Sequence, residues 1–137
     1  MSFPVYSTST QTRRIARTNR VMQRSKVEDL IRNAGVFNCK QTTGTTLWSP
    51  HARGDATDLM LKVVSRKNAE TVGRNVVAQA TKRTFANRGR KLDVVHIIFG
   101  NTQWVRGQGL SHYDGVANDN HVHVGGSFSS PAKPPCA

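Results

Sequence analysis

Apolar residues recur at helical spacing between residues 25 and 35. Ser25 and Glu28 form the S-x-x-E pattern of a capping box, and Gly35 stands where a helix commonly ends. The pattern therefore predicts a helix over residues 25–35, followed by a short strand over 36–40. The apolar positions that share the helical face are Val27, Leu30, Ile31 and Ala34.

A second stripe of small and apolar residues predicts a longer helix over residues 68–87. Its positions keep near-helical spacing for about five turns, which is longer than any other periodic segment of the chain. The stripe consists of Ala69, Val72, Val76, Ala80 and Thr84, widened by Val77 and Phe85.

Runs rich in β-branched and alternating apolar residues predict strands over 56–64, 92–99 and 121–124. Gly100 and Asn101 form a two-residue turn signal, after which "TQWV" is expected to return as the second arm of a hairpin. The stretch between this hairpin and the last strand is expected to be a loop. Helices and strands mix without regular βαβ alternation, which predicts an α+β fold with a small, mostly antiparallel sheet flanked by two main helices.

The chain of 137 residues has the length of one domain, and its ends differ in composition from its middle. Residues 1–24 hold five arginines and no acidic residue, and few of their side chains could build a core. We therefore expect a basic, flexible N-terminal arm or frayed helix over 1–24. The folded domain is then expected over 25–126, with a C-terminal tail over 127–137.

The charge balance is strongly basic, with 20 Lys and Arg against 8 Asp and Glu and a formal net charge of +12. Such a balance indicates a polyanionic partner, such as nucleic acid, an anionic membrane surface or an anionic cell envelope. No apolar run approaches the roughly 20 residues that span a bilayer, and "MSFPVYSTST" lacks the pattern of a secretory signal. An extracellular role would then need another route, such as host lysis or packaging into a particle.

The two cysteines, Cys39 and Cys136, do not predict a disulfide framework. They share no short metal-ligand spacing, and Cys136 lies in the tail. They can pair only if the tail folds back towards Cys39, which the sequence leaves open.

Histidines and one aspartate form the candidate chemistry. His121 and His123 point to the same face of a strand, one pleat apart. His51 ends a loop and Asp58 begins a strand, so both can converge with one of the late pair. Two histidines and an aspartate, with water in the fourth position, are typical of a catalytic zinc site.

These motifs resemble those of the M15 zinc peptidases, which cleave peptidoglycan peptides. The segment "SPHARGDATD" matches the S-x-H-x-x-G-x-A-x-D signature of that family, and "NHVHV" matches the H-x-H of the wider class. This class includes D-alanyl-D-alanine carboxypeptidases, lysostaphin-type endopeptidases and the hedgehog fold. The resemblance covers roughly residues 25–126. It implies zinc held by His51, Asp58 and His123, with His121 as the catalytic histidine.

Two positions depart from the family pattern. Asn120 stands where many M15 enzymes carry a catalytic glutamate, so we expect His121 to handle the proton or stabilise the oxyanion, with Asp119 as its helper or as a replacement for the glutamate. Lys40 is the nearest cation where family members often hold a substrate carboxylate with arginine, which favours endopeptidase over carboxypeptidase action.

Further candidates for substrate contact are Arg53, His96 and Trp104. His96 and Trp104 lie among apolar residues, so each is open between lining a cleft and packing in the sheet or core. Together with Lys40 they complete the expected substrate-binding set.

Two other functions compete with a monomeric zinc peptidase of the bacterial cell wall. The first is a nucleic-acid-binding protein whose arginine arm tracks phosphates; it explains the charge but leaves both histidine motifs without a role. The second is a domain of the same fold that carries a metal and binds the cell wall without catalysis, because the usual glutamate is missing.

Overall fold

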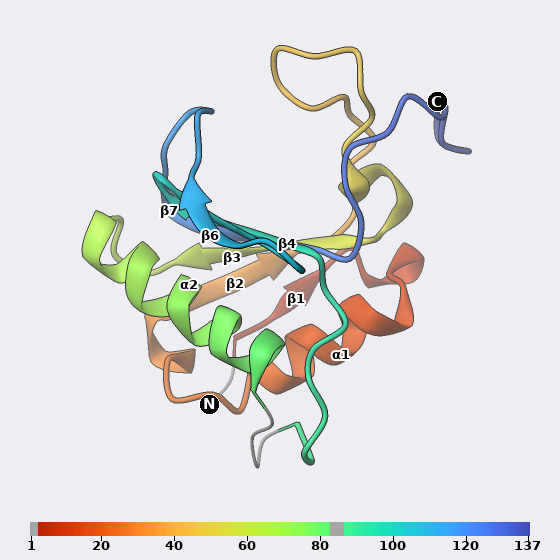
Figure 1. Ribbon diagram of the computed structural model, residues 1–137. Helices are drawn as coiled ribbons and strands as arrows, with labels where there is room; N and C mark the ends of the chain where they lie inside the picture. Colours follow the sequence, from red (N-terminus) through yellow and green to blue (C-terminus); the bar gives the residue numbers. More distant parts are fainter. Residues whose placement is uncertain (1–2, 83–86) are drawn as a thin grey trace.

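The computed structural model describes residues 3–82 and 87–137, which form one mixed sheet with helices on one side (Figure 1). Seven strands of the described chain pair in the order β1-β2-β3-β7-β4-β5-β6, and only β1 and β2 run parallel. The strands are β1 (Val5–Tyr6), β2 (Ile31–Gly35), β3 (Ala56–Leu61), β4 (His96–Gly100), β5 (Thr102–Val105), β6 (Gly109–His112) and β7 (Asn118–Gly125). The helices are α1 (Arg13–Met22) and α2 (Arg66–Thr81), with short 3-10 turns η1 (Thr8–Thr10), η2 (Glu28–Leu30) and η3 (Pro50–Arg53).

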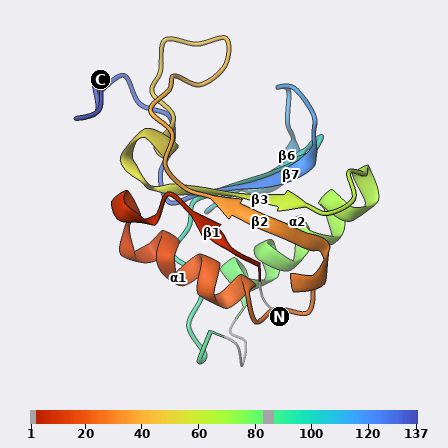
Figure 2. The ribbon, with the colours of Figure 1, turned by 180° about the vertical axis from the view of Figure 1, so that it is seen from behind.

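Both helices cover the same face of the sheet, as the front and back views show (Figures 1 and 2). Alternate residues of the central strands point into this helical layer and form the core. They pack against Ile15 and Met22 of α1 and against Val72 and Val76 of α2. The opposite face of the sheet carries polar and apolar side chains side by side, as in the direct pairs of His123 with Ile98 and of His121 with Met60. The sheet residues of the core are Leu59, Leu61, Ile97, Phe99, Val122 and Val124.

The α+β class and the mostly antiparallel sheet are confirmed, but the sheet is larger than expected. Its two outermost strands, β1 and β6, fall in segments expected as an arm and a loop. Neither helix of the described chain is long and apolar enough to cross a membrane.

The helix predicted over residues 25–35 is wrong: the segment forms η2 and then strand β2. Ser25 caps no helix, because its hydroxyl donates to the Met22 carbonyl at the end of α1. The pairing of β2 with β3 shifts between Ile31 and Asn33. This irregularity buries both Ile31 and Ala34, three residues apart, and so produces a helical spacing within a strand.

Residues 1–24 were expected to be a flexible arm or a frayed helix; their described part does contain a helix, but that helix is packed in the core and is not a flexible arm. Helix α1 buries Ile15 and Met22 completely. Two polar residues, Thr18 and Asn19, occupy the same inner face, and Asn19 accepts a hydrogen bond from the Thr57 hydroxyl at 3.0 Å. The polar residues on the buried face hid the amphipathic pattern from the sequence.

The remaining predictions hold in part. The hairpin with its turn at Gly100 and Asn101 is confirmed, since Phe99 pairs with Thr102. Helix α2 overlaps the range predicted for the longer helix but begins earlier, at Arg66, and ends at Thr81; the predicted positions 84 and 85 lie outside the described residues. Residues 36–40 form no strand, and strand β4 begins only at His96.

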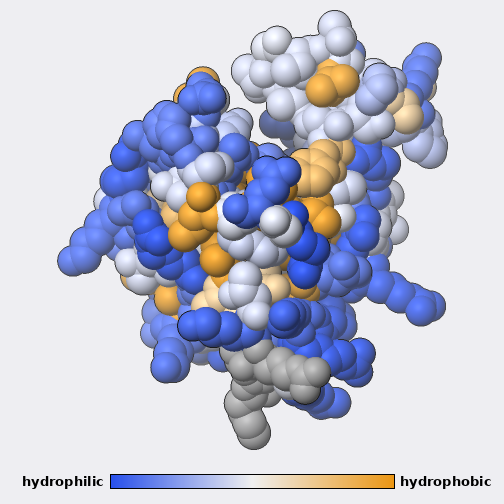
Figure 3. Space-filling view, viewed as in Figure 1, coloured by the Kyte–Doolittle hydropathy of each residue, from blue (hydrophilic) through white to orange (hydrophobic). Residues whose placement is uncertain are grey.

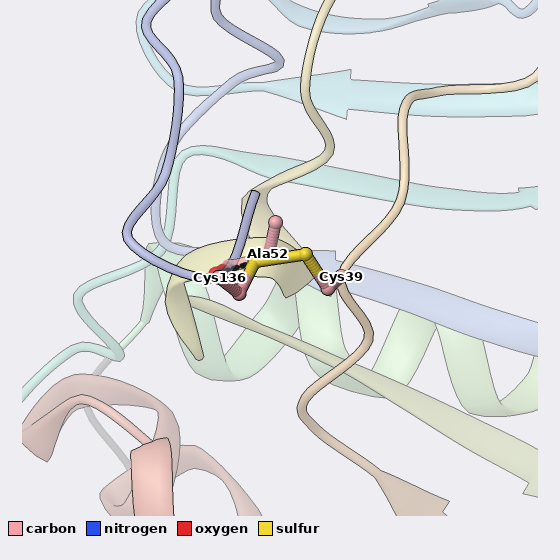
Figure 4. The surroundings of a disulfide bond; sticks show 3 residues. All are labelled: Cys39, Ala52 and Cys136. Carbon is pink, nitrogen blue, oxygen red and sulfur yellow. Dashed lines mark hydrogen bonds between the residues drawn. A yellow bond between two sulfur atoms is a disulfide. The ribbon is translucent and has the colours of Figure 1, made fainter.

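The C-terminal tail folds back onto the domain and is joined to it by a disulfide between Cys39 and Cys136 (Figure 4). The Cys136 sulfur also lies 3.7 Å from the Ala52 carbonyl oxygen in η3. Nearer the start of the tail, Ser130 forms an isolated β-bridge with Trp48. The tail therefore lies against the loop that precedes η3.

Candidate metal centre

The turn η3 places His51 at the edge of the sheet. Its start is capped by Ser49, whose hydroxyl accepts the His51 backbone N–H. It ends at Gly54, whose φ of 67° is left-handed. A Cβ added at Gly54 would lie 1.6 Å from the Thr10 carbonyl oxygen, so only glycine fits there. The glycine of the first motif is thus explained by a backbone contact with the segment before α1.

Asp58 and His123 face each other across the β3–β7 ladder, and Met60 and His121 form the next pair on the same face. His51 reaches this face from η3. Nitrogen or oxygen atoms of His51, Asp58 and His123 all lie within 4.8 Å of one another, and the three side chains could hold a metal ion.

One carboxylate oxygen, Asp58 Oδ1, is the centre of the group. It lies 3.1 Å from His51 Nε2 and 3.2 Å from His123 Nδ1. The other nitrogen of His51, Nδ1, lies 2.7 Å from the Val36 carbonyl oxygen and donates to it, because a carbonyl can only accept. A histidine ligand whose second nitrogen is fixed by a backbone carbonyl is the usual arrangement around a bound metal. The residues therefore fit a metal site.

The pKa values of Asp58 and His51 shift in opposite directions. Burial alone would raise the pKa of Asp58, but hydrogen bonds and charge from His123 and His51 hold it well below its usual range. Burial alone would lower the pKa of His51, but the Asp58 carboxylate and the Val36 carbonyl together raise it. Asp58 is therefore ionised, as a metal ligand must be, and a metal ion would compete with the proton on His51.

The group lies at the base of a cleft of about 410 Å³. One wall comes from the loop at residues 40–43 and from Ser129 of the tail, and Thr42 and Ser129 share a hydrogen bond across it. The opposite wall is the tip between β6 and β7, with Tyr113 and Val116. The space-filling view shows the surface hollowed between these two projections (Figure 3).

Among the predicted site residues, His121, Lys40 and His96 line this cleft. His121 Nε2 lies 3.8 Å from Asp58 Oδ1, and its Nδ1 lies 2.6 Å from the Asn120 side-chain oxygen. Burial lowers the pKa of His121, so its imidazole is neutral near pH 7. His96 Nε2 hydrogen-bonds the Gln103 side chain at 2.8 Å.

Asp119 is not part of the cleft, contrary to expectation. Its carboxylate binds Arg66 at the start of α2, with 2.5 Å between Oδ1 and Nε. The pairing of β7 with β4 shifts between Ile98 and Gly100, which breaks the alternation that would have aimed Asp119 towards the metal group.

Arg53 and Trp104 are likewise placed elsewhere. The Arg53 guanidinium donates to the Ser127 hydroxyl and the Phe128 carbonyl, both at 2.9 Å, and so holds the start of the tail. Trp104 is buried in the core cluster, with the Arg106 guanidinium over its ring. Neither lines the cleft.

Tyr113, Thr42 and Ser129 line the cleft but were not predicted from the sequence. Tyr113 precedes the Asp-Gly of "SHYDGV", a turn signal that could have indicated an exposed hairpin tip beside the histidines. Ser129 reaches the cleft only because the tail folds back, which no local pattern shows.

Comparisons with family models, with curated proteins and with solved structures find no match to this chain. The function is therefore argued from the geometry of the cleft and from the sequence motifs.

Proposed function

We propose that the protein is a zinc-dependent peptidase that hydrolyses peptide bonds of bacterial peptidoglycan, with the hedgehog and D-alanyl-D-alanine peptidase type of fold. The observation that carries the proposal is the meeting of His51, Asp58 and His123 at the base of an open cleft. Two nitrogens and one carboxylate oxygen suit Zn²⁺, and three protein ligands beside an open cleft are typical of catalytic zinc. Structural zinc sites are closed and usually rich in thiolates, whereas both cysteines here are joined to each other.

Zinc bound there would supply a Lewis acid and a water of lowered pKa. His121 is the residue that takes up a proton on the cleft side. Its Nδ1–H is occupied by Asn120, so the free Nε2 faces Asp58 and the cleft. Because its pKa is lowered by burial, this nitrogen is available as a base at neutral pH.

Endopeptidase action is favoured over carboxypeptidase action by the cations of the cleft. Of the described residues, Lys40 is the one lysine or arginine that lines it. A carboxypeptidase must hold the terminal carboxylate of its substrate, for which the two-pronged guanidinium is better suited than an ammonium group. An open cleft with one flexible lysine suits a chain that continues on both sides of the scissile bond.

The expected partner is the bacterial cell wall. Its teichoic acids and stem-peptide carboxylates are anionic, and a net charge of +12 would concentrate a monomeric enzyme on that surface. Release by host lysis or transport in a phage particle would bring the protein to the wall.

A second candidate keeps the metal and the wall but not the catalysis. It is favoured by one observation: of the described residues, Asp58 is the one carboxylate that lines the cleft, and it already belongs to the metal group. In that case His121 would be a bystander beside a binding site.

Metal analysis and activity measured on the same preparations test both candidates. Protein purified without chelators should contain one zinc per chain, and His51→Ala or His123→Ala should lose it, because three-ligand sites seldom tolerate the loss of a ligand. Asp119→Asn is the matched control and should retain the metal. Full zinc content in His51→Ala and His123→Ala would contradict the proposed ligand set.

Hydrolysis of purified sacculi then separates enzyme from binding domain. His121→Ala should keep its zinc and lose about a hundredfold or more in kcat, since it removes the proposed base. Asp119→Asn should stay near wild type, because that carboxylate is held by Arg66 away from the cleft. If wild type, zinc-loaded, cleaves no sacculi but sediments with them, the binding-domain function is the correct one.

A further inference from the structure

A second pocket of the described chain lies on the helical side of the sheet, against α1. Its volume is about 360 Å³, and five of its seven lining residues are arginines. Three of them, Arg17, Arg20 and Arg24, are spaced by three and four residues and share one side of α1 and its final turn. The other two, Arg88 and Arg90, come from the loop that follows the described part of α2. Asn87 and Val21 complete the lining.

The wall formed by this loop is fastened to the helix by Arg17. Its guanidinium donates to the carbonyl oxygens of Lys91 and Asn87, both at 3.0 Å, and of Arg90 at 3.3 Å. Arg17 is thus committed to carbonyls, while Arg20, Arg24, Arg88 and Arg90 are exposed. The pocket is therefore formed by two walls that the protein holds together without a ligand.

The positive charge of the pocket is not balanced by the protein. Within the described chain no ion pair reaches any of the five arginines; the ion pairs of arginine involve Arg14, Arg66 and Arg74. The Asp93 carboxylate acts on Arg17 through its charge but forms no ion pair with it. Burial, followed by the charges of Arg90 and Arg20, lowers the pKa of Arg17, as expected where cations face one another.

Stabilisation of α1 does not explain this number of cations. The carboxyl end of a helix carries the equivalent of about half a negative charge, which a single cation neutralises. Here five arginines line one pocket, and the last turn of α1 already has its Asn19 and Val21 carbonyls bonded by the backbone N–H groups of Gln23 and Arg24.

We propose that this pocket is a binding site for a compact phosphorylated ligand that carries no nucleobase. Guanidinium groups bind phosphate oxygens in pairs, and a phosphate monoester carries nearly two negative charges at pH 7. The volume lies within the range of small-molecule sites. None of the described residues that line the pocket is aromatic, so none of them would stack on a base, which argues against nucleic acid. The site lies across the sheet from the metal centre and does not depend on the proposed peptidase activity.

Calorimetric titration of the full-length protein with sodium tripolyphosphate at low salt tests the proposal. We expect one site per chain, weakened at higher ionic strength because the contacts are between charges. Arg20→Gln/Arg90→Gln removes two exposed cations of the pocket but leaves the Arg17 contacts, and should weaken binding by roughly tenfold or more. Arg32→Gln/Lys62→Gln removes the same charge from exposed positions outside the pocket and should change binding less than about twofold. Thermal melts of both variants check that each is folded.

Equal losses in the two double variants would mean that bulk charge alone attracts the anion, and would overturn the site. Citrate and pyrophosphate carry similar charge at pH 7, and citrate should bind at least tenfold more weakly than pyrophosphate; equal binding of these two anions would overturn the phosphate assignment. A short oligothymidylate should also bind more weakly. If it binds more tightly and loses that affinity in Arg20→Gln/Arg90→Gln, the pocket takes nucleic acid, and the base-free ligand is wrong.

Discussion

Asp55 is the third residue of an Arg-Gly-Asp triplet, yet it is only 3% exposed. Its carboxylate accepts hydrogen bonds from the Arg14 guanidinium, at 2.7 and 2.5 Å, and from the Thr12 hydroxyl at 2.8 Å. Its backbone carbonyl accepts the Gly126 N–H at 2.8 Å. Asp55 therefore connects α1 with the turn that carries His51 and with the end of β7. Because its side chain is buried, the Arg-Gly-Asp triplet is not exposed as an adhesion motif would be.

The ion pair of Asp55 predicts a pH-dependent stability. Burial would raise the pKa of Asp55, but hydrogen bonds from Arg14, Ser127 and Thr12 outweigh it and lower the pKa. A carboxyl with a lowered pKa in the folded state stabilises the fold above its unfolded pKa of about 3.9, and this contribution is lost as pH falls below that value. Asp55→Asn should lower the free energy of unfolding by roughly 1–3 kcal/mol at pH 7, a range reduced because Arg14 is partly exposed.

Urea unfolding between pH 7 and pH 2 measures this contribution. The difference between wild type and Asp55→Asn should shrink as the pH falls below about 4. Asp93→Asn is the control, since its carboxylate is 73% exposed and 4.0 Å from Arg14. A constant difference at every pH would show that the asparagine acts through packing and not through charge.

Among the helices and strands, the correct predictions concern those whose local sequence pattern agrees with their packing in the fold. The β4–β5 hairpin was found because its turn residues and flanking runs are adjacent in the chain. Strand β2 was missed because the irregularity at Ile31 and Asn33 imitates helical spacing. Helix α1 was missed because two polar residues lie on its buried face, where the Thr18 hydroxyl bonds back to the Arg14 carbonyl of the same helix and the Asn19 side-chain oxygen accepts from Thr57 of β3.

The same reasoning applies to the candidate site. His51, Asp58 and His123 could be placed together because two motifs hold them: the S-x-H-x-x-G-x-A-x-D pattern contains His51 and Asp58, and the H-x-H pattern contains His123. Asp119 could not be placed, because a shift in strand pairing depends on both strands and not on β7 alone. Tyr113 and Ser129 enter the cleft through the fold of a hairpin and a tail, which sequence patterns do not specify.

The close contact between α2 and the sheet depends on Gly73, a residue without a side chain. A Cβ at Gly73 would lie 2.1 Å from Cγ of the Phe99 ring in β4. Gly73→Ala should therefore destabilise the fold by about 1–3 kcal/mol, although alanine favours a helix by about 1 kcal/mol over glycine.

The matched control is Gly35→Ala in β2, where an added Cβ meets no atom within 4 Å. This variant should unfold within about 0.5 kcal/mol of wild type. Thermal unfolding of the two variants gives the comparison. A stabilised Gly73→Ala would mean that α2 is packed less closely on Phe99 than described.

At the scale of the whole molecule, the sheet separates two kinds of surface. The helical side holds the core and the arginine pocket, whereas the other side holds the metal group and its cleft. One wall of the cleft depends on the tail, which Arg53 holds at its start and the disulfide holds near its end. The shape of the cleft therefore depends on the attachment of the tail to the domain.

Removal of the disulfide should lower the free energy of unfolding and should also make the tail side of the cleft more mobile. Cys39 and Cys136 are 97 residues apart, and a crosslink over such a distance stabilises proteins by typically 2–4 kcal/mol through the freedom it removes from the unfolded chain. Cys39→Ser/Cys136→Ser should lose stability in that range but keep its zinc, because all three ligands lie outside the tail. Under the proposed peptidase function, its KM for wall peptides should rise more than its kcat falls.

Urea unfolding, elemental analysis and sacculus kinetics of that double variant provide the three readings. Loss of zinc would show that the tail supports His51 through Ala52 and does more than form a wall.

The bond between Cys39 and Cys136 also closes residues 39–136 into a covalent ring, which leaves residues 1–38 outside it as a linear segment. All three side chains of the candidate metal site and both walls of the cleft belong to the ring. A protease that cuts once in the largely exposed loop at residues 41–47 would release no fragment until the disulfide is reduced. A cut between α1 and Cys39, in contrast, leaves β1 and α1 attached to the rest of the protein by non-covalent contacts alone. The disulfide therefore holds the cleft together after a cut, but it does not hold the helix that carries the arginine pocket.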